Sequence, residues 1–135
     1  MKTFLALTAL ALVAGCASGE PVDTSADAEA ALAAELRDYE QAGPPVSCVN
    51  MRNIAGNRSV GSSAIIFEGQ TGGRLFVNRP PAGCPVLNHG RALQTRTITT
   101  QLCRGDIATV FDPVSGASYG GCGLGDFTPY RRRGS

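Results

Sequence analysis

After Val46 the chain consists of short apolar or alternating segments separated by Gly, Asn and Pro, and this pattern most restricts the folds open to it. Alternating segments of about four to eight residues between turn residues predict β-strands. Gly56 with Asn57, and residues 70–73, are typical of hairpin turns. The sequence therefore predicts a mainly β fold, a small antiparallel barrel or sandwich. We expect strands near residues 47–54, 59–68, 74–78, 93–101 and 107–111, with a short one near Ala117.

One helix is expected before these strands, over residues 27–41. This segment is rich in Ala, Glu and Leu, and three larger side chains fall at helical spacing: Leu32, Leu36 and Tyr39. Thr24 or Ser25 would cap the helix, and Gly43 followed by two prolines would end it. Because the apolar stripe is narrow and mostly alanine, two arrangements stay open: the helix packs on the strands, or it extends a tether, which we slightly favour.

The N-terminus has the features of an export signal. The apolar run at residues 4–13 follows Lys2 and is shorter than the roughly 20 residues of a membrane-spanning helix. Residues 12–16, Leu-Val-Ala-Gly-Cys, resemble the lipobox of bacterial lipoproteins. The resemblance implies removal of residues 1–15 and acylation of Cys16, which would anchor the chain to a membrane. Ala17 follows the cysteine where an Asp would be a retention signal, so the resemblance implies the outer membrane, facing the periplasm.

The rest of the chain divides into three parts by composition and charge. We expect an acidic leader and helix over residues 16–45, a β-domain over 46–128 and a basic tail over 129–135. Residues 17–45 hold seven acidic side chains against Arg37, a formal charge of −6, whereas ten arginines against four acidic residues give the remainder +6.

All basic residues after the signal are arginines, whose planar guanidinium suits carboxylate and phosphate. Anionic lipid, envelope glycan or a protein are therefore the expected partners, and a solubilising surface is the alternative. Contact with anionic lipid is one function for the tail residues Arg131, Arg132 and Arg133; a solvated chain end is the other. Location in the envelope disfavours nucleic acid.

Four cysteines remain after Cys16, an even number in a small exported domain, which predicts two disulfides. Metal binding is disfavoured because no CxxC pair occurs and His89 is the only histidine. Spacing leaves the pairing open. A nested pairing, Cys48–Cys122 with Cys84–Cys103, would hold both ends of the domain and is preferred here over the sequential pairing, Cys48–Cys84 with Cys103–Cys122.

No motif predicts a catalytic residue, a cofactor or a metal. The glycines around Cys122 lack the strand-turn-helix context of a nucleotide loop and fit close packing around a disulfide. The serines lack a GxSxG elbow, and His89 has no partner that would make it a base. Asp106 and Asp112 bracket an expected strand and suit its turns. We therefore expect binding or structure without catalysis; an unrecognised enzyme is a further hypothesis.

The order of several short motifs is similar to that of a family of small uncharacterised bacterial envelope proteins with four cysteines. The resemblance covers about two thirds of the mature chain and implies an exported β-domain, with no activity and no catalytic residue. The motifs are Cys48 with Arg52 and Ile54, Ala64 to Glu68, Arg74 to Arg79, Cys84-Pro85, Leu102-Cys103 with Asp106, and Cys122 to Phe127.

A shorter motif, Ser-Gly-Ala-Ser-Tyr at residues 115–119, resembles a loop of membrane-bound lysozyme inhibitors. That family has Lys where this chain has Ser118, so the cation expected to meet an acidic enzyme cleft is missing. The family's second Tyr/Lys loop is also not apparent. The resemblance implies inhibition of an exported hydrolase through Tyr119.

Overall fold

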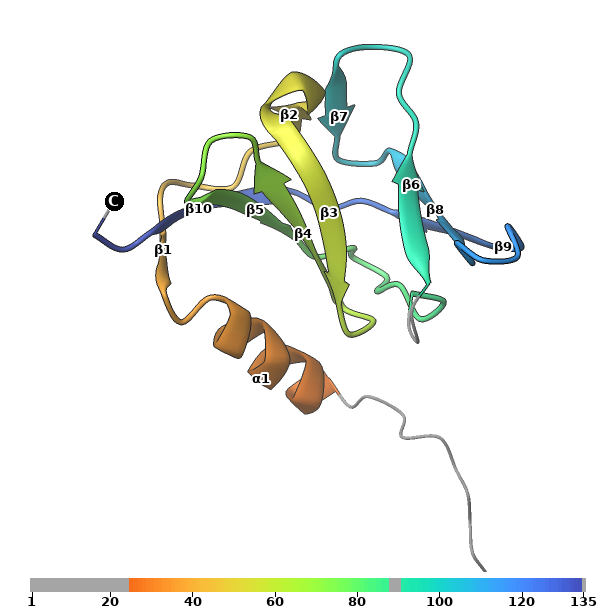
Figure 1. The fold of residues 1–135 in the computed structure, drawn as a ribbon, viewed down its shortest axis with the longest axis horizontal. Helices are drawn as coiled ribbons and strands as arrows, with labels where there is room; N and C mark the ends of the chain where they lie inside the picture. Colours follow the sequence, from red (N-terminus) through yellow and green to blue (C-terminus); the bar gives the residue numbers. More distant parts are fainter. Residues whose placement is uncertain (1–24, 88–90, 135) are drawn as a thin grey trace, which may run out of the picture.

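The computed structural model of the protein describes residues 25–87 and 91–134. Within them, one helix precedes strands in three antiparallel sheets that do not close into a barrel (Figure 1). The largest sheet has five strands in the order β1 (Tyr39–Gln41), β10 (Phe127–Arg132), β5 (Arg74–Asn78), β4 (Ala64–Gly69) and β3 (Ile54–Val60). The others pair β2 (Cys48–Asn50) with β7 (Gln101–Cys103), and β6 (Ala92–Thr95), β8 (Ile107–Phe111) and β9 (Ser118–Gly123).

Strand β4 is buried on both faces of the large sheet. Its side chains point alternately into two hydrophobic cores, the first between the sheets and the second on the opposite face. Ile65 and Phe67 face the smaller sheets, where Phe67 packs edge-on against Phe127 with ring centroids 5.4 Å apart. Ile66 and Ala64 face the opposite side. The first core also takes buried side chains from β7 and β8, so the sheets pack as a sandwich.

Helix α1 (Ser25–Glu35) covers the opposite side of the large sheet (Figure 1). Leu32 is 1 % exposed and Ala28 3 % exposed, so the expectation that the helix would only extend a tether was wrong. The narrow apolar stripe is enough to hold the helix on the sheet because the side chain of Leu32 is fully buried between them. Leu32 packs in a cluster with Val60, Ala64, Ile66, Leu75 and Val77.

The helix ends at Glu35, earlier than predicted, because residues 39–41 pair with β10 from the far end of the chain. The predicted basic tail is correspondingly ordered as far as Arg132, within β10. Both changes have one cause, a long-range strand pairing that replaces local helical preference.

The strand at 107–111 and the strand at 74–78 have the predicted bounds, and residues 70–73 form the predicted turn. The turn predicted at Gly56 and Asn57 was wrong. Both residues lie inside β3, next to a register shift, and the chain reverses instead at residues 61–63, where Gly61 adopts a φ of 57°. The predicted strands at 47–54, 59–68 and 93–101 each divide. The first divides around the 3₁₀ turn Met51–Asn53, and the second divides at the turn of residues 61–63.

Two disulfides are present, and neither candidate pairing was right. The bonds join Cys48 to Cys103 and Cys84 to Cys122, so they cross along the sequence. Cys48 and Cys103 are direct neighbours on β2 and β7, with Cα atoms 4.0 Å apart. The bond between Cys84 and Cys122 joins the proline-rich segment to β9, and both cysteine side chains are buried in the first core.

The glycines near Cys122 serve close packing, as expected. A Cβ on Gly125 would lie 2.4 Å from the carbonyl oxygen of Arg79, so only glycine fits there. The fully buried Asn78 holds the same residue by two hydrogen bonds. Its Nδ2 donates to the Gly125 carbonyl at 2.7 Å, and its Oδ1 accepts from the Gly125 N–H at 2.9 Å.

Candidate functional site

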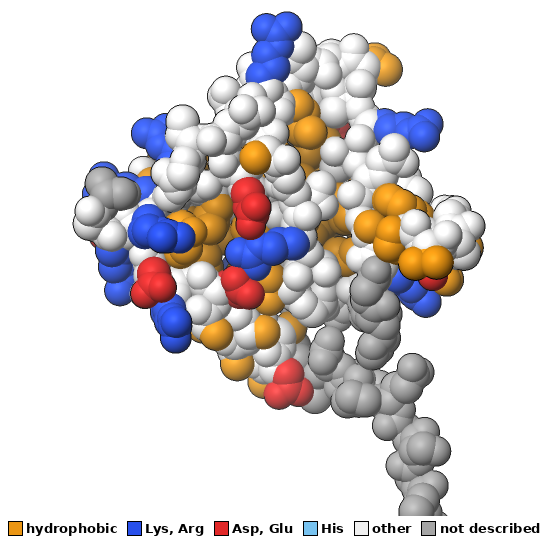
Figure 2. All heavy atoms as spheres, in the orientation of Figure 1, with side chains coloured by type: hydrophobic (Ala, Val, Ile, Leu, Met, Phe, Trp, Pro, Cys, Tyr) orange, Lys and Arg blue, Asp and Glu red, His pale blue; other side chains and the backbone are white. Residues whose placement is uncertain are grey.

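The acidic leader and the arginine-rich body meet through ion pairs. Arg79 contacts Glu29 of the helix at 2.9 Å, and Arg131 contacts Glu40 of β1 at 2.8 Å. Figure 2 shows acidic and basic side chains next to one another on this face. Such half-exposed pairs contribute only about 0–1 kcal/mol each, so they orient the leader more than they stabilise it. Part of the positive charge of the body is thus neutralised within the chain.

The most extensive of these contacts is formed by Arg58 on β3. Its guanidinium lies between Glu35 at 2.6 Å and Glu68 at 2.9 Å. Partial burial lowers the pKa of Arg58, but the hydrogen bonds and charges of Glu68 and Glu35 together raise it above its ordinary value. Arg58 therefore stays charged and joins the end of the helix to the sheet.

A second group of arginines is less fully paired, and we call it the arginine end: Arg74, Arg131, Arg132 and Arg133. Arg74 and Arg131 lie directly opposite each other on β5 and β10, so their side chains share one face of the sheet. Glu40 lies opposite Arg131 on its other side and neutralises that charge. Within the part of the chain that the structure describes, the Arg74 side chain has no hydrogen bond or ion pair.

The other face of the same edge carries Arg132 beside Tyr39. Its Cζ lies 5.5 Å from the ring centroid, and its Nη2 donates to the tyrosine hydroxyl at 3.2 Å. The hydrogen bond to Tyr39 raises the pKa of Arg132, which remains a cation. The backbone N–H of Arg133 donates to the Asp38 carbonyl, which fixes the chain end, while its exposed side chain has no partner among the described residues.

A shallow hollow lies on each face of this edge. One has a volume of about 250 Å³ and is lined by apolar residues that include Phe76 and Pro129, and by Arg74 and Arg131. The other, of about 460 Å³, is lined by three guanidinium groups and by Glu35, Asp38, Tyr39 and Ala34; the three belong to Arg37, Arg58 and Arg132. Chemically, the edge offers guanidinium donors on two faces, which suit phosphate or carboxylate groups. Around the larger hollow, Glu35 and Asp38 pair with Arg58 and Arg37, so the unpaired charge lies at Arg74 on the other face.

The other predicted contact residue, Tyr119, lies at the opposite end of the molecule, next to the β8–β9 turn. Within the turn, the Asp112 side chain accepts hydrogen bonds from the N–H groups of Val114 at 2.7 Å and Ser115 at 3.0 Å. These bonds, first that from Ser115, lower the pKa of Asp112. Val114 is 95 % exposed at the tip, and the guanidinium of Arg91 lies 3.6 Å from the Tyr119 ring centroid.

The remaining residues singled out in the sequence lie outside the arginine end and the β8–β9 turn. Cys16 and His89 lie outside the described residues. Asp106 is a turn residue as predicted, since its Oδ2 accepts from the Cys103 N–H at 2.7 Å. The sequence did not indicate Arg74 or Tyr39 as part of a surface, because their neighbours come from strands more than fifty residues away, and no local motif reports such pairing.

Over residues 25–87 and 91–134, no group of His, Cys, Asp and Glu side chains is placed to hold a metal ion. Within the same residues, the structure has no helix long and apolar enough to cross a bilayer. Comparison with known proteins found no matching family model, no matching curated protein and no matching solved structure. The two disulfides are consistent with an extracytoplasmic protein.

Proposed function

We propose that this protein is a lipid-anchored component of the cell envelope, at the periplasmic face of the outer membrane, which binds anionic lipid head groups through the arginine end and performs no catalysis. The observation that carries the proposal is the position of Arg74 and Arg133. Both are exposed, and neither has a partner in the described structure, although most arginines around them do.

Anchoring through Cys16 would bring this surface to a membrane. Cys16 precedes the first residue of helix α1, Ser25, by nine positions, a chain length that spans at most about 30 Å. The helix is packed on the sheet, so the domain could not move farther from the bilayer than this short leader allows. This reach allows a cationic surface to contact lipid head groups, and each arginine within a Debye length of an anionic surface gains about 1 kcal/mol.

The test is cosedimentation of the chain from residue 16, with Cys16→Ser to remove the anchor, with vesicles of phosphatidylcholine alone or mixed with phosphatidylglycerol. We expect binding only to the mixed vesicles, weakening as salt rises. Arg74→Ala with Arg133→Ala should reduce the affinity about 30-fold, the equivalent of about 2 kcal/mol.

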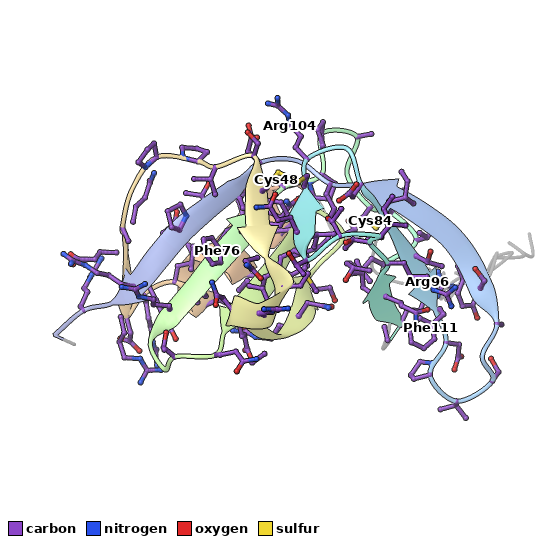
Figure 3. All side chains as sticks on the ribbon, turned by 90° about the horizontal axis from the view of Figure 1, so that it is seen from above. Cys48, Phe76, Cys84, Arg96, Arg104 and Phe111 are labelled. Atoms are coloured by element: carbon purple, nitrogen blue, oxygen red, sulfur yellow. A yellow bond between two sulfur atoms is a disulfide. The ribbon has the colours of Figure 1, made fainter. Side chains whose placement is uncertain are left out.

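A matched control removes the same charge elsewhere. Arg52 and Arg96 are also exposed, and neither side chain has a partner in the described part of the chain. Figure 3 shows Arg96 beside the three-stranded sheet, away from the end that carries β1 and β10. Replacing Arg52 and Arg96 together by alanine should leave most of the affinity intact. Equal losses of vesicle affinity in the two double variants would reject the arginine end as the binding surface. If a soluble acidic glycan displaced the protein from the vesicles, the ligand of the arginine end would be the glycan instead.

A second candidate, inhibition of an exported hydrolase such as lysozyme, is favoured by the contact between Arg91 and Tyr119. Ser118 stands where the lysozyme-inhibitor family has a lysine. The guanidinium of Arg91, which lies outside the motif, supplies a cation beside Tyr119 instead. The test measures peptidoglycan hydrolysis by lysozyme with and without the protein. Inhibition that Tyr119→Ala abolishes would support this function, and unchanged hydrolysis at excess protein would exclude it for lysozyme.

A further inference from the structure

Strand β9 is an edge of the three-stranded sheet, because the strand order is β6-β8-β9. It lies at the margin of the molecule in Figure 1. Five of its six residues are exposed, and only Cys122 is buried. The disulfide from Cys122 to Cys84 ties the strand to the core, so this edge is both open and fixed in position.

In the regular part of β9, between the register shift and the end of the strand, the backbone groups that face outward belong to two glycines. Just beyond the strand, the Leu124 N–H donates to the Asp106 carbonyl at 2.9 Å. Hydrogen-bonded and non-hydrogen-bonded positions alternate along an antiparallel pair, so Gly123 and Gly121, opposite Ile107 and Thr109, direct their N–H and C=O groups away from β8. In the described structure no strand pairs with this side of β9.

The side chain of Ile107 extends over these glycines. A Cβ on Gly121 would lie 2.5 Å from the Ile107 Cγ2, and one on Gly123 would lie 4.0 Å from its Cδ1. The glycines therefore leave room for Ile107 to lie across β9 towards the free edge. Ile107 remains 58 % exposed there, an apolar surface beside unpaired backbone groups.

Natural edge strands avoid self-pairing by means of charged residues, prolines or bulges. From Val114 to Gly125 the chain has neither a charged residue nor a proline. The register shift between β8 and β9 falls beside Tyr119, at the other end of the strand from Gly121 and Gly123. A charged residue on this edge would repel the same residue of a second copy. Because the edge is uncharged, two copies can pair without such repulsion.

We propose that the occupant of this edge is a second copy of the same chain, whose β9 pairs antiparallel with the first. A two-fold axis at Cys122 places Gly121 of one copy opposite Gly123 of the other, so both pairs of residues exchange hydrogen bonds. The two Ile107 side chains meet over the junction and remove apolar surface from water. A strand from an unrelated protein would find no side-chain pockets at these glycines, whereas the two-fold pairing supplies its own apolar contact. Only a short stretch pairs, so the dimer is weak.

The test is sedimentation equilibrium of the full-length protein in density-matched detergent, over a concentration series that reaches millimolar protein. We expect a reversible monomer–dimer equilibrium. Ile107→Lys should abolish it, because two like charges then meet at the axis, while circular dichroism stays unchanged since Ile107 is exposed. Ile98→Lys is the matched control: Ile98 is fully exposed in the β6–β7 connection and should dimerise like the unchanged protein.

A mixture of Ile107→Lys and Ile107→Glu proteins should recover the dimer, because opposite charges then face each other across the axis. A protein that is monomeric throughout the series would overturn the proposal and would leave the edge to a strand of another protein. Dimerisation of Ile107→Lys equal to that of the unchanged protein would overturn it as well. The result does not depend on lipid binding by the arginine end, which lies on a different sheet.

Discussion

Replacing Leu32 by alanine tests whether the leader is part of the folded domain. Leu32 is 1 % exposed and belongs to a buried cluster whose five other members lie on the sheet. Burial of a leucine contributes about 1.5–3 kcal/mol in transfer alone, and the cavity that remains brings the cost of Leu→Ala to about 2–5 kcal/mol. For a domain of this size, a loss of 1 kcal/mol lowers the melting temperature by roughly 4 °C, so we expect a decrease of about 8–20 °C.

Urea unfolding followed by circular dichroism, with the disulfides intact, gives the free energy directly. Leu36→Ala is the graded control, since Leu36 is only partly buried beside the same cluster and should cost less. If the helix detaches before the sheet unfolds, hydrogen exchange should show early loss of protection in residues 28–36 alone. A change below about 0.5 kcal/mol for Leu32→Ala, the range of ordinary surface substitutions, would refute the packing of the helix on the sheet.

Three further outcomes follow from the fold. Asn78→Ala should cost about 2–4 kcal/mol in urea unfolding, because the buried N–H and C=O of Gly125 lose their partners; a surface-like value would contradict that clamp. The pKa of Asp112 is lowered in the fold, so the order of its turn should persist above about pH 4 and be lost as the pH falls through the lowered pKa. Amide exchange of Val114, measured as a function of pH, should show this transition, and Asp112→Ala should remove it. Tryptic digestion without reduction separates all four cysteines, and mass spectrometry should find only the crossed pairs, Cys48–Cys103 and Cys84–Cys122.

The fold class could be predicted from the sequence because the signals that carry it are local. Strands at 74–78 and 107–111 are bounded by turn residues, and their alternation is visible in a few residues. The helix prediction failed at its end for a physical reason. Tyr39 continues the helical spacing of Leu32 and Leu36, but the same side chain reaches the second core equally well from a strand, and β10 supplies a partner there.

The disulfide pairing could not be predicted, because it depends on which strands are neighbours. Cys48 and Cys103 are joined since β2 pairs with β7, and neither strand exceeds three residues. Strands that short carry almost no register information in their sequence. The nested pairing placed Cys122 at the end of the domain, whereas β10 follows it and closes the large sheet.

Charge composition separates an acidic segment from a basic one but does not report the contact between them. An acidic segment of −6 before a basic segment of +6 is compatible with a free tether and with a docked one. The ion pairs that join Arg58, Arg79 and Arg131 to the leader are formed with glutamates 23 to 91 residues away along the chain. What distinguishes the arginine end is therefore that two arginines without partners, Arg74 and Arg133, lie at the same end of the large sheet as Arg131 and Arg132. This grouping is identifiable only in three dimensions.

The most direct test of the proposed function is to observe which residues approach a bilayer. The acylated protein, labelled with ¹⁵N, would be placed on phosphatidylglycerol-containing nanodiscs whose head groups carry a spin label, and paramagnetic broadening measured for each amide. We predict the strongest broadening at Gly73, Arg74 and residues 131–133, and little at residues 96–100. Broadening centred on residues 112–117, or none in the folded domain, would contradict a membrane role for the arginine end.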